Sequence, residues 1–254
     1  MKKVKALKKK KFFLKKKSFW IFFLLLLFFA LSFYAAVFWE KFQIKEVRIM
    51  GEENDFSASV RSFAAEEIEK FSWTKSIFLF DGSSMEKILE KEFPEIKKAS
   101  VEKTIPGTLN IFIERRKEAA FWNFGEYFFS MDEEGVIFRE PERIESLPVI
   151  SDMEYAGSPC LGDKVINEEK LAGALLISRG IEGISGIELE KMIILSGKRL
   201  NAVTAEGWEV YFNLEEDLIW QTTKLKLLFQ EEISLERRKT LEYIDLRFEK
   251  AFYK

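Results

Sequence analysis

The residue types that most enzymes use for catalysis are scarce in this sequence. Its 254 residues include no histidine and a single cysteine, Cys160. Without imidazole there is no Ser-His-Asp or Cys-His nucleophile, no histidine metal ligand and no histidine proton shuttle. One cysteine can form neither a disulfide within the chain nor a zinc site of several thiolates. We therefore predict no metal site, and we expect Cys160 to be a small, buried or half-exposed residue.

Two kinds of chemistry remain open. A Ser-Lys pair could supply a nucleophile and its base, but both residue types are abundant and no spacing singles out a pair. Asp132, Glu133 and Glu134 form a carboxylate cluster, and a glycosidase would need two carboxylates held at a defined separation across a cleft. The cluster precedes Gly135 in a predicted hairpin turn, where acidic side chains are usually solvated. We predict no catalytic residue and no cofactor, and hence a protein that is not an enzyme.

Charge divides the chain at Glu40. Ten lysines and no acidic residue precede it, whereas the rest of the chain has 30 basic and 42 acidic residues, a net charge of −12. Residues 18–39 carry no charge, and as a helix these 22 residues would be about 33 Å long, enough to cross a bilayer. Trp20 near one end, and Tyr34 and Trp39 near the other, suit the headgroup layers. The sequence therefore predicts one transmembrane helix.

The lysines fix the expected orientation of this helix. Positive charge is retained in the cytoplasm, so residues 1–17 should form a cytoplasmic basic tail and the body after Glu40 should be exported. A cleaved signal peptide is the alternative, because the small residues Ala35 and Ala36 follow the apolar run. That run is longer than the ~7–15 residues of a signal-peptide core. The lysine tail could also bind nucleic acid, but topology and anionic lipid explain it better, and we predict no nucleic-acid partner.

Residues 42–116 are predicted to form a β-α-α-β-β module. A strand should run from Phe42 to Gly51. The helix after it should be capped by Asp55, Ser57 or Ser59, and a second helix should follow Asp81-Gly82 and end before Pro94. Candidate core residues are Ile44, Val47 and Ile49 of the strand, Val60, Phe63, Ala64 and Ile68 of the first helix, and Met85, Ile88, Leu89 and Phe93 of the second. The acidic residues Glu66, Glu67 and Glu69 should lie on the opposite side of the first helix. Two strands should then flank the turn Ile105-Pro106-Gly107, where glycine permits a positive φ.

Residues 117–254 are predicted to form a mostly antiparallel β domain, which makes the whole an α+β protein. Strand-like segments lie at 119–124, 127–139, 192–205 and 208–214, with turns at Gly125, Glu134-Gly135, Gly197 and Gly207. Helices are expected at about Glu168–Arg179 and Leu218–Phe229. In the second helix Leu218, Leu225, Leu228 and Phe229 form a stripe that should face the core rather than a partner.

The sequence closes on YIDLRFEKAFYK, residues 243–254. As one alternating strand it would place Ile244, Leu246, Phe248 and Phe252 on its apolar face. Such a closing strand would leave an edge of unpaired N–H and C=O groups that nothing later in this sequence covers. The edge could remain solitary, protected by Glu249, Lys250 and Lys254, or it could receive a partner strand.

Several motifs resemble the FtsQ/DivIB family of single-span bacterial division proteins and its POTRA domain. They are IFLFD (77–81), FPEI (93–96), PGTL (106–109), ER (114–115), DEEGVIF (132–138), LP (147–148) and YIDLRF (243–248), in that order along the chain. Three positions depart from the family pattern: Lys117 replaces a proline, and Ser151 and Asn213 replace glycines. The resemblance implies a single transmembrane helix, a POTRA domain and a C-terminal β domain.

The resemblance also implies partners. In this family the terminal strand receives a strand from FtsB, which travels with FtsL as a membrane-anchored coiled coil. Carried over, Phe248 is the aromatic contact site, with Ala251, Phe252, Tyr253 and Arg247 as further candidates. The POTRA surface around Ile44–Ile49 and the first helix should contact other division proteins. The expected protein is thus a non-enzymatic scaffold at the division septum in the cell membrane; the alternative is a POTRA-type chaperone of outer-membrane protein assembly or polypeptide transport.

Overall fold

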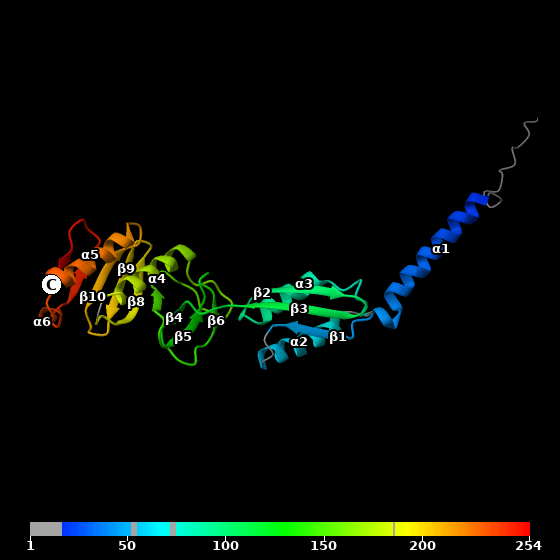
Figure 1. Ribbon diagram of the computed structural model, residues 1–254, viewed down its shortest axis with the longest axis horizontal. Helices are drawn as coiled ribbons and strands as arrows, with labels where there is room; N and C mark the ends of the chain where they lie inside the picture. The colour runs from blue at the N-terminus through cyan, green and yellow to red at the C-terminus, as the bar shows by residue number, and fades with distance from the viewer. Residues whose placement is uncertain (1–16, 52–54, 72–74, 185) are drawn as a thin grey trace, which may run out of the picture. The chain divides into compact units, whose positions relative to one another are not determined.

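The computed structural model describes residues 17–51, 55–71, 75–184 and 186–254 (Figure 1). The described chain groups into two compact units. The first consists of the chain up to Leu89 together with Ala99–Ile113, and the second of Glu90–Lys98 together with Glu114–Lys254. Of the basic tail predicted at residues 1–17, all but Lys17 lies outside the described residues.

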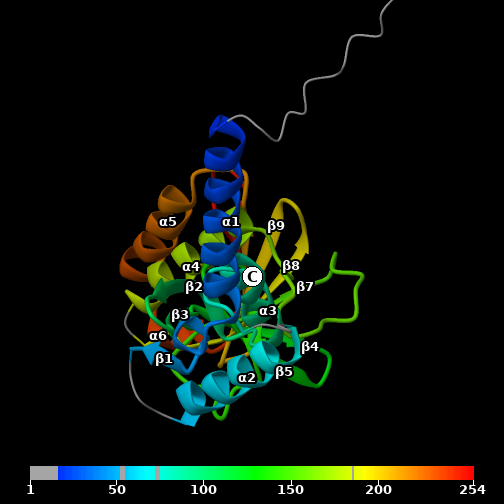
Figure 2. The ribbon, with the colours of Figure 1, turned by 90° about the vertical axis from the view of Figure 1, so that its right-hand side faces the viewer.

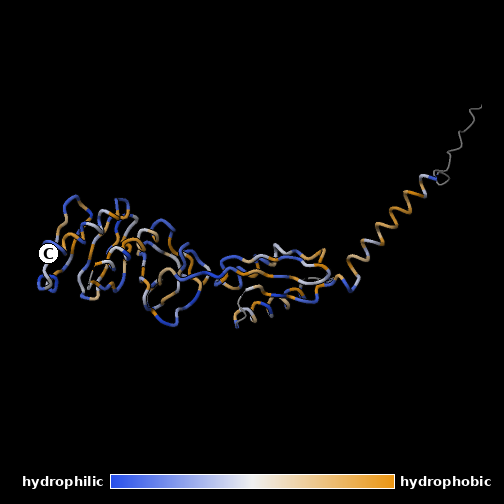
Figure 3. Tube along the Cα trace, viewed as in Figure 1, coloured by the Kyte–Doolittle hydropathy of each residue, from blue (hydrophilic) through white to orange (hydrophobic). Residues whose placement is uncertain are grey.

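Helix α1 (Lys17–Phe38) confirms the predicted apolar segment to within one residue at each end. It is the one helix among the described residues that is long and apolar enough to cross a bilayer, with a mean hydropathy of 2.7. Figure 3 shows it as a long hydrophobic stretch. Nearly all its side chains are exposed, and only Val37 in the last turn is buried. An unburied apolar helix of this length needs lipid as its surroundings, which fits a single-pass membrane anchor.

The chain next forms the predicted β-α-α-β-β module. After the short 3-10 helix η2 (Glu40–Phe42), its elements are β1 (Glu46–Met50), α2 (Asp55–Phe71), α3 (Gly82–Glu92), β2 (Ile96–Thr104) and β3 (Thr108–Arg115). The sheet order is β1-β3-β2, and β1 runs parallel to β3. Val60, Ala64 and Ile68 of α2 and Met85 and Leu89 of α3 are buried, as their spacing predicted. Leu109 and Ile111 of β3 are buried as well.

Three local expectations for this module are wrong. The first strand begins at Glu46 rather than Phe42, because residues 40–42 turn as a 3-10 helix, although Ile44 is still buried. Ser57 and Ser59 do not cap α2: both lie inside it, and the Ser59 hydroxyl donates to the Asp55 carbonyl. Glu67 is buried rather than on the solvent face, and its carboxylate accepts a hydrogen bond from Lys70 at 3.0 Å.

Gly107 is needed for a reason other than the predicted one. Its φ is not positive. Instead, the turn passes so close to the segment after α1 that a Cβ at this position would lie 2.2 Å from the Gln43 carbonyl oxygen. This contact is held by backbone hydrogen bonds from Lys45 and Glu46 to the Gly107 carbonyl, at 2.9 and 3.3 Å. Glycine therefore lets the β2-β3 turn pack against the chain that leaves the membrane helix.

The C-terminal unit is built on a nine-stranded sheet of order β12-β11-β10-β9-β8-β7-β4-β5-β6. Its elements are β4 (Ala120–Phe124), β5 (Tyr127–Met131), β6 (Ile137–Arg139), β7 (Val149–Asp152), α4 (Glu168–Glu182), β8 (Leu189–Ser196), β9 (Arg199–Thr204), β10 (Glu209–Asn213), α5 (Leu218–Glu231), α6 (Leu235–Arg238), β11 (Tyr243–Asp245) and β12 (Phe252–Tyr253). Most of its strand pairs are antiparallel, as predicted. Three are parallel: β4 with β7, β7 with β8, and β10 with β11.

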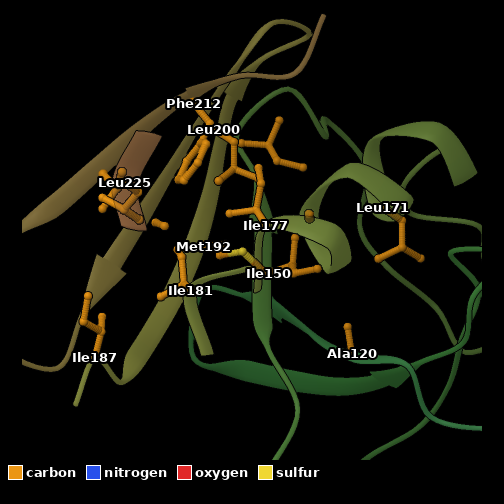
Figure 4. Close-up of a cluster of buried hydrophobic side chains, with 14 of the residues drawn as sticks. Ala120, Ile150, Leu171, Ile177, Ile181, Ile187, Met192, Leu200, Phe212 and Leu225 are labelled. Carbon is orange, nitrogen blue, oxygen red and sulfur yellow. The ribbon is translucent and has the colours of Figure 1, made fainter. Parts of the chain in front are cut away.

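Helices α4 and α5 lie together on one side of the sheet (Figure 2). The core forms between them and that face, where Ile177 and Ile181 of α4 lie near Met192, Leu200 and Phe212 (Figure 4). The stripe predicted on α5 belongs to this core: Leu225 and Leu228 are buried, and Leu218 and Phe229 pack against them. The opposite face of the sheet carries no helix among the described residues.

Two features of this unit differ from expectation. Strand β7 was not predicted, because its four residues follow a loop and its two neighbours, β4 and β8, lie far from it in the sequence. Cys160 is exposed rather than buried or half-buried, because it lies in a loop where its backbone N–H donates to Asp163.

The close approach at Gly107 predicts a large effect of one methyl group. Gly107→Ala should lower the free energy of unfolding by about 1–3 kcal/mol, because the Gln43 carbonyl is backbone and cannot move aside cheaply. Gly197→Ala is the control, since a Cβ there meets nothing within 4 Å and its φ is not positive. Urea unfolding of the full-length protein in a nanodisc measures both. Equal effects of the two substitutions would contradict the account of Gly107.

Candidate partner-binding edge

The last twelve residues form a hairpin rather than the single strand predicted. Strand β11 ends at Asp245, the chain bends through Arg247–Lys250, and β12 returns antiparallel, pairing Ile244 with Tyr253 and Asp245 with Phe252. The edge of β11 is therefore covered by β12, against expectation. The edge of the sheet is β12 itself.

Two contacts hold the bend. The Arg247 guanidinium and backbone N–H donate to the Asp245 carboxylate, with side-chain distances of 2.8 and 2.6 Å. From the other side, Lys224 of α5 donates from Nζ to the carbonyl oxygens of Leu246 and Phe248, at 2.8 and 2.6 Å. Burial lowers the pKa of Lys224, and the nearby Asp245 carboxylate partly opposes this. Helix α5 thus places a half-buried ammonium group where it can stop the strand and turn the chain.

The bend divides the five predicted contact residues into two groups. Ala251 and Tyr253 face the core: Ala251 packs against it, and the Tyr253 hydroxyl donates to Glu232 at 3.2 Å. Phe248 and Phe252 are each 55% exposed and contact each other edge to face, with ring centroids 5.9 Å apart. Both were expected on the apolar face with Ile244, and that expectation is wrong. Arg247 lies between the groups, with its guanidinium 5.6 Å from the Phe248 ring.

Phe252 lies on the helix-free face of the sheet, because its register partner Asp245 points away from the buried Ile244. Two residues of the same face, which sequence analysis did not single out, lie nearby: Tyr211 of β10 and Tyr243 of β11 stack with centroids 5.4 Å apart. The Tyr211 ring also lies 4.5 Å from the Arg199 guanidinium. Alternation in 208–214 could have placed Tyr211 on this face, but the parallel pairing of β10 with β11 could not be predicted.

The outer edge of β12 has backbone groups that point away from the sheet. Tyr243 and Lys254 exchange backbone hydrogen bonds, so they form a hydrogen-bonded pair. In an antiparallel ladder the adjacent pair, Ile244 with Tyr253, is then a non-hydrogen-bonded pair. The N–H and C=O of Tyr253 therefore point outward, where a further strand could pair with them.

The opposite edge of the nine-stranded sheet is closed. Residues 162–165 run beside β6, where Ile137 donates to the Asp163 carbonyl at 3.0 Å and accepts from the Gly162 N–H at 2.7 Å. Val136 and Lys164 form an antiparallel bridge there. At this edge the outer backbone groups of Ile137 are thus already paired, whereas those of Tyr253 at the β12 edge point outward.

The carboxylate cluster at Asp132–Glu134 is structural. It lies in the predicted turn between β5 and β6, but Asp132 is buried rather than solvated. Its carboxylate accepts from the backbone N–H groups of Glu134 and Val136, both at 3.0 Å, and pairs with the Arg116 guanidinium. These bonds fix the hairpin turn and occupy the group that a catalytic acid would need free. No group of three potential metal-ligating side chains occurs among the described residues.

These features define a class of protein: a single-pass membrane protein whose membrane helix is followed by a small three-stranded domain and a larger nine-stranded one, and whose larger sheet ends at an open, aromatic-flanked edge. Comparison with family models makes the assignment specific. Residues 42–116 match the FtsQ-type POTRA domain, and residues 120–247 match the C-terminal domain of the cell division proteins FtsQ/DivIB. The chain therefore belongs to the FtsQ/DivIB family and has a role in cell division. A search of curated proteins finds no match.

The contact between Lys224 and the bend predicts a local effect. Lys224→Met should raise the amide hydrogen exchange of residues 246–254 by roughly tenfold or more, since two charge-assisted hydrogen bonds are lost, each contributing about 1.5–3 kcal/mol at most. Lys226→Met, which changes an exposed residue on the same helix, should leave the exchange unaltered. Exchange measured by mass spectrometry on the full-length protein tests this. Unchanged exchange in Lys224→Met would show that the hairpin is held by other contacts.

The Asp245–Arg247 pair predicts a pH dependence. Burial acts to raise the pKa of Asp245, but hydrogen bonds and charge from Arg247 outweigh it, so its pKa lies below the ordinary value. The stabilisation is therefore complete above about pH 4 and is lost as the pH falls through the lower folded-state pKa. The deficit in unfolding free energy of Asp245→Asn, measured in urea, should be largest at pH 7 and shrink toward pH 3. Glu249→Gln, in the same bend, should show no such deficit; a deficit in Asp245→Asn that does not change with pH would contradict this assignment.

Proposed function

We propose that this protein is a non-enzymatic scaffold of the cell-division machinery. In this proposal it is anchored in the cell membrane with its N-terminus in the cytoplasm. Its exported body recruits and links other division membrane proteins at the septum, and so couples the cytoplasmic ring to septal wall synthesis. Family membership supports the cell-division role. The observation that carries the proposed mode of action is the open β12 edge flanked by Phe248 and Phe252.

The proposed partner is a coiled-coil division protein of the FtsB type, accompanied by one of the FtsL type. Its strand would pair with the outward N–H and C=O of Tyr253, since strand addition draws its affinity from main-chain hydrogen bonds. Alternate side chains of an added strand fall on opposite faces. Those on the helix-free face would contact Phe252 and Phe248, which supply specificity through aromatic burial.

The edge is short, and this sets a requirement on the partner. Two residues of β12 offer few backbone bonds, so strand pairing alone is too small for a stable complex. Additional surface must come from side chains beside the strand, and the exposed Phe248–Phe252 pair is the adjacent apolar surface. A membrane anchor on both partners helps further, because confinement to one bilayer raises their effective concentration.

The POTRA domain is proposed as a second contact region, through the surface around Ile44–Ile49 and α2. Strand β1 lies at an edge of the three-stranded sheet. The far edge, β2, is partly blunted, because the Glu86 carboxylate accepts a hydrogen bond from the Val101 N–H at 2.8 Å. Of the two edges, β1 is thus the better candidate for other division proteins.

The aromatic pair provides the test. Phe252 and Phe248 are each replaced in living cells by a photo-crosslinking amino acid, and the captured protein is identified. We expect capture of a single-span coiled-coil division protein at both positions. Tyr127, which is 67% exposed on the β4–β5 hairpin of the same unit, is the matched control and should not capture it. Capture of the same protein at Tyr127, or of none at either phenylalanine while cells divide normally, would contradict the proposed edge.

Substitution gives the quantitative counterpart. The double variant Phe248→Ala/Phe252→Ala should bind that partner at least about tenfold more weakly, because exposed aromatic anchors contribute more than about 1 kcal/mol each at an interface. Its unfolding free energy should change little, since both side chains are more than half exposed. Titration of the purified full-length proteins in nanodiscs measures the affinity, with Tyr127→Ala as control. An unchanged affinity would place the contact elsewhere.

The alternative, a POTRA-type chaperone of outer-membrane protein assembly or polypeptide transport, is not favoured. The match to the FtsQ/DivIB C-terminal domain covers residues 120–247 and points to cell division. Depletion of the protein distinguishes the two. Filamentous cells with normal envelope β-barrels support the scaffold, whereas normal division with lost β-barrels supports the chaperone.

A further inference from the structure

Three large apolar side chains are exposed at one end of the POTRA domain. Phe78, Leu79 and Ile105 are 47%, 51% and 61% exposed. The first two lie in the segment between α2 and α3, and the third lies in the β2-β3 turn. The fold does not require them to be apolar, because Ile77 and Phe80, on either side of the first pair, already fill the core positions of their loop.

Both loops are attached by hydrogen bonds to the segment that leaves the membrane helix. The Ser76 hydroxyl donates to the Ala36 carbonyl in the last turn of α1, at 3.0 Å. The Ile77 N–H donates to the Phe42 carbonyl at 3.0 Å, and the Ile44 N–H to the Lys75 carbonyl at 2.8 Å. The β2-β3 turn is attached through Gly107, as described above. The exposed side chains are therefore fixed close to the end of α1.

Aromatic contacts lead from α1 to the first loop. The Trp39 ring contacts Phe42 with centroids 5.6 Å apart, and Phe42 contacts Phe78 at 5.3 Å. A helix of 22 residues is about 33 Å long, close to the ~30 Å hydrocarbon core of a bilayer. The end of α1 must then lie where the core meets the headgroup layer, which is roughly 5–8 Å thick on each side. Phe78, two ring contacts from Trp39, is within reach of that layer.

We infer that Phe78, Leu79 and Ile105 insert into the headgroup layer of the bilayer that α1 crosses, so that the POTRA domain rests on the membrane by a second contact. The occupant is phospholipid, because the patch is continuous with the membrane helix through the contacts above. Nearby charges are compatible with it. Lys75 lies on the first loop, and Lys103 lies near the end of β2, two residues before Ile105. Lys75 pairs with Glu69 and Lys103 donates to the Phe80 carbonyl, and both positive charges suit anionic headgroups. The Asp81 carboxylate is engaged by Ser83 and Ser84 at the start of α3.

This contact goes beyond the proposed scaffold role and is independent of β12. Its consequence is orientation. A domain attached only by a helix end can tilt freely, whereas one that rests on lipid through two loops keeps a fixed side toward the membrane. The contact surface around β1 would then be held at a constant height above the bilayer, available to partners anchored in the same membrane.

The test uses the full-length protein in nanodiscs with a fluorophore at single cysteines. Cys160, which is exposed, is first changed to serine. An environment-sensitive dye is then placed at Leu79→Cys and at Ile105→Cys, and its quenching by lipids brominated near the headgroup is measured. Phe112→Cys is the matched control: Phe112 is 39% exposed in the same domain and lies four residues along β3 from Thr108, roughly 13 Å further from the turn.

We expect several-fold stronger quenching and a blue-shifted emission at positions 79 and 105 compared with position 112. Quenching at 79 and 105 no stronger than at 112 would overturn the inference. A dye at Leu25→Cys in α1 reports whether the helix is in the bilayer. If the dye at position 25 is quenched while the dyes at positions 79 and 105 are not, α1 crosses the bilayer but the second membrane contact is wrong. Neither result affects the crosslinking test at Phe252.

Discussion

The structure depends on one constraint: an open β-sheet ends in two strands whose outer N–H and C=O groups lack partners. The C-terminal unit meets this constraint differently at its two edges. At β6 the chain folds residues 162–165 alongside, so that the backbone of Ile137 is paired on its outer side. At the other edge the sheet is extended by only two residues of β12. A sheet whose one edge is already paired at Ile137 and whose other edge is short and open is better suited to accept a further strand at β12.

The same asymmetry applies to the faces of this sheet. Helices α4 and α5 cover one face, and the main core cluster of the unit lies on that side. Phe121, which alternates with Ala120 and Trp122 of that cluster, is buried on the other face. On the other face, polar and aromatic side chains cover each other: Asp245 is buried by Arg247, and Tyr211 lies against Arg199 and Tyr243. A self-covered face needs no further layer for stability. It remains free for contact, and the open edge and the aromatic pair adjoin it.

Periodicity predicted most of the fold because burial follows spacing. The two POTRA helices and the stripe on α5 were predicted from apolar positions that recur at the period of a helix, and the membrane helix from the length of its uncharged apolar run. The features that could not be predicted depend on contacts between residues that are far apart in the sequence. Gly107 is required by its contact with Gln43, which lies more than sixty residues earlier in the sequence. Asp132 pairs with Arg116, and β7 lies between β4 and β8. No local pattern encodes such neighbours.

The closing segment shows why the predicted edge was only partly correct. Alternation through YIDLRFEKAFYK is genuine, and Ile244 and Leu246 are buried as it requires. The strand stops because Lys224, some twenty residues earlier, takes the carbonyls of Leu246 and Phe248, and because Arg247 folds back on Asp245. The periodicity of a sequence indicates which residues could share a face of a strand. It does not indicate that a lysine of helix α5 ends the strand.

Exposed aromatic residues connect the two proposals. The chain contains 26 phenylalanines, and outside α1 a folded domain would be expected to bury them, since each removes a large apolar area from water. Phe121, Phe138 and Phe212 are buried in this way. Phe78 is exposed instead beside the end of the membrane helix, and Phe248 and Phe252 beside the open edge. An exposed apolar patch beside the end of a membrane helix, or beside an open sheet edge, indicates a surface for lipid or for another protein. In the two proposals, that neighbour is lipid at the membrane helix and a partner strand at β12, where a strand could pair with the backbone groups that Tyr253 presents.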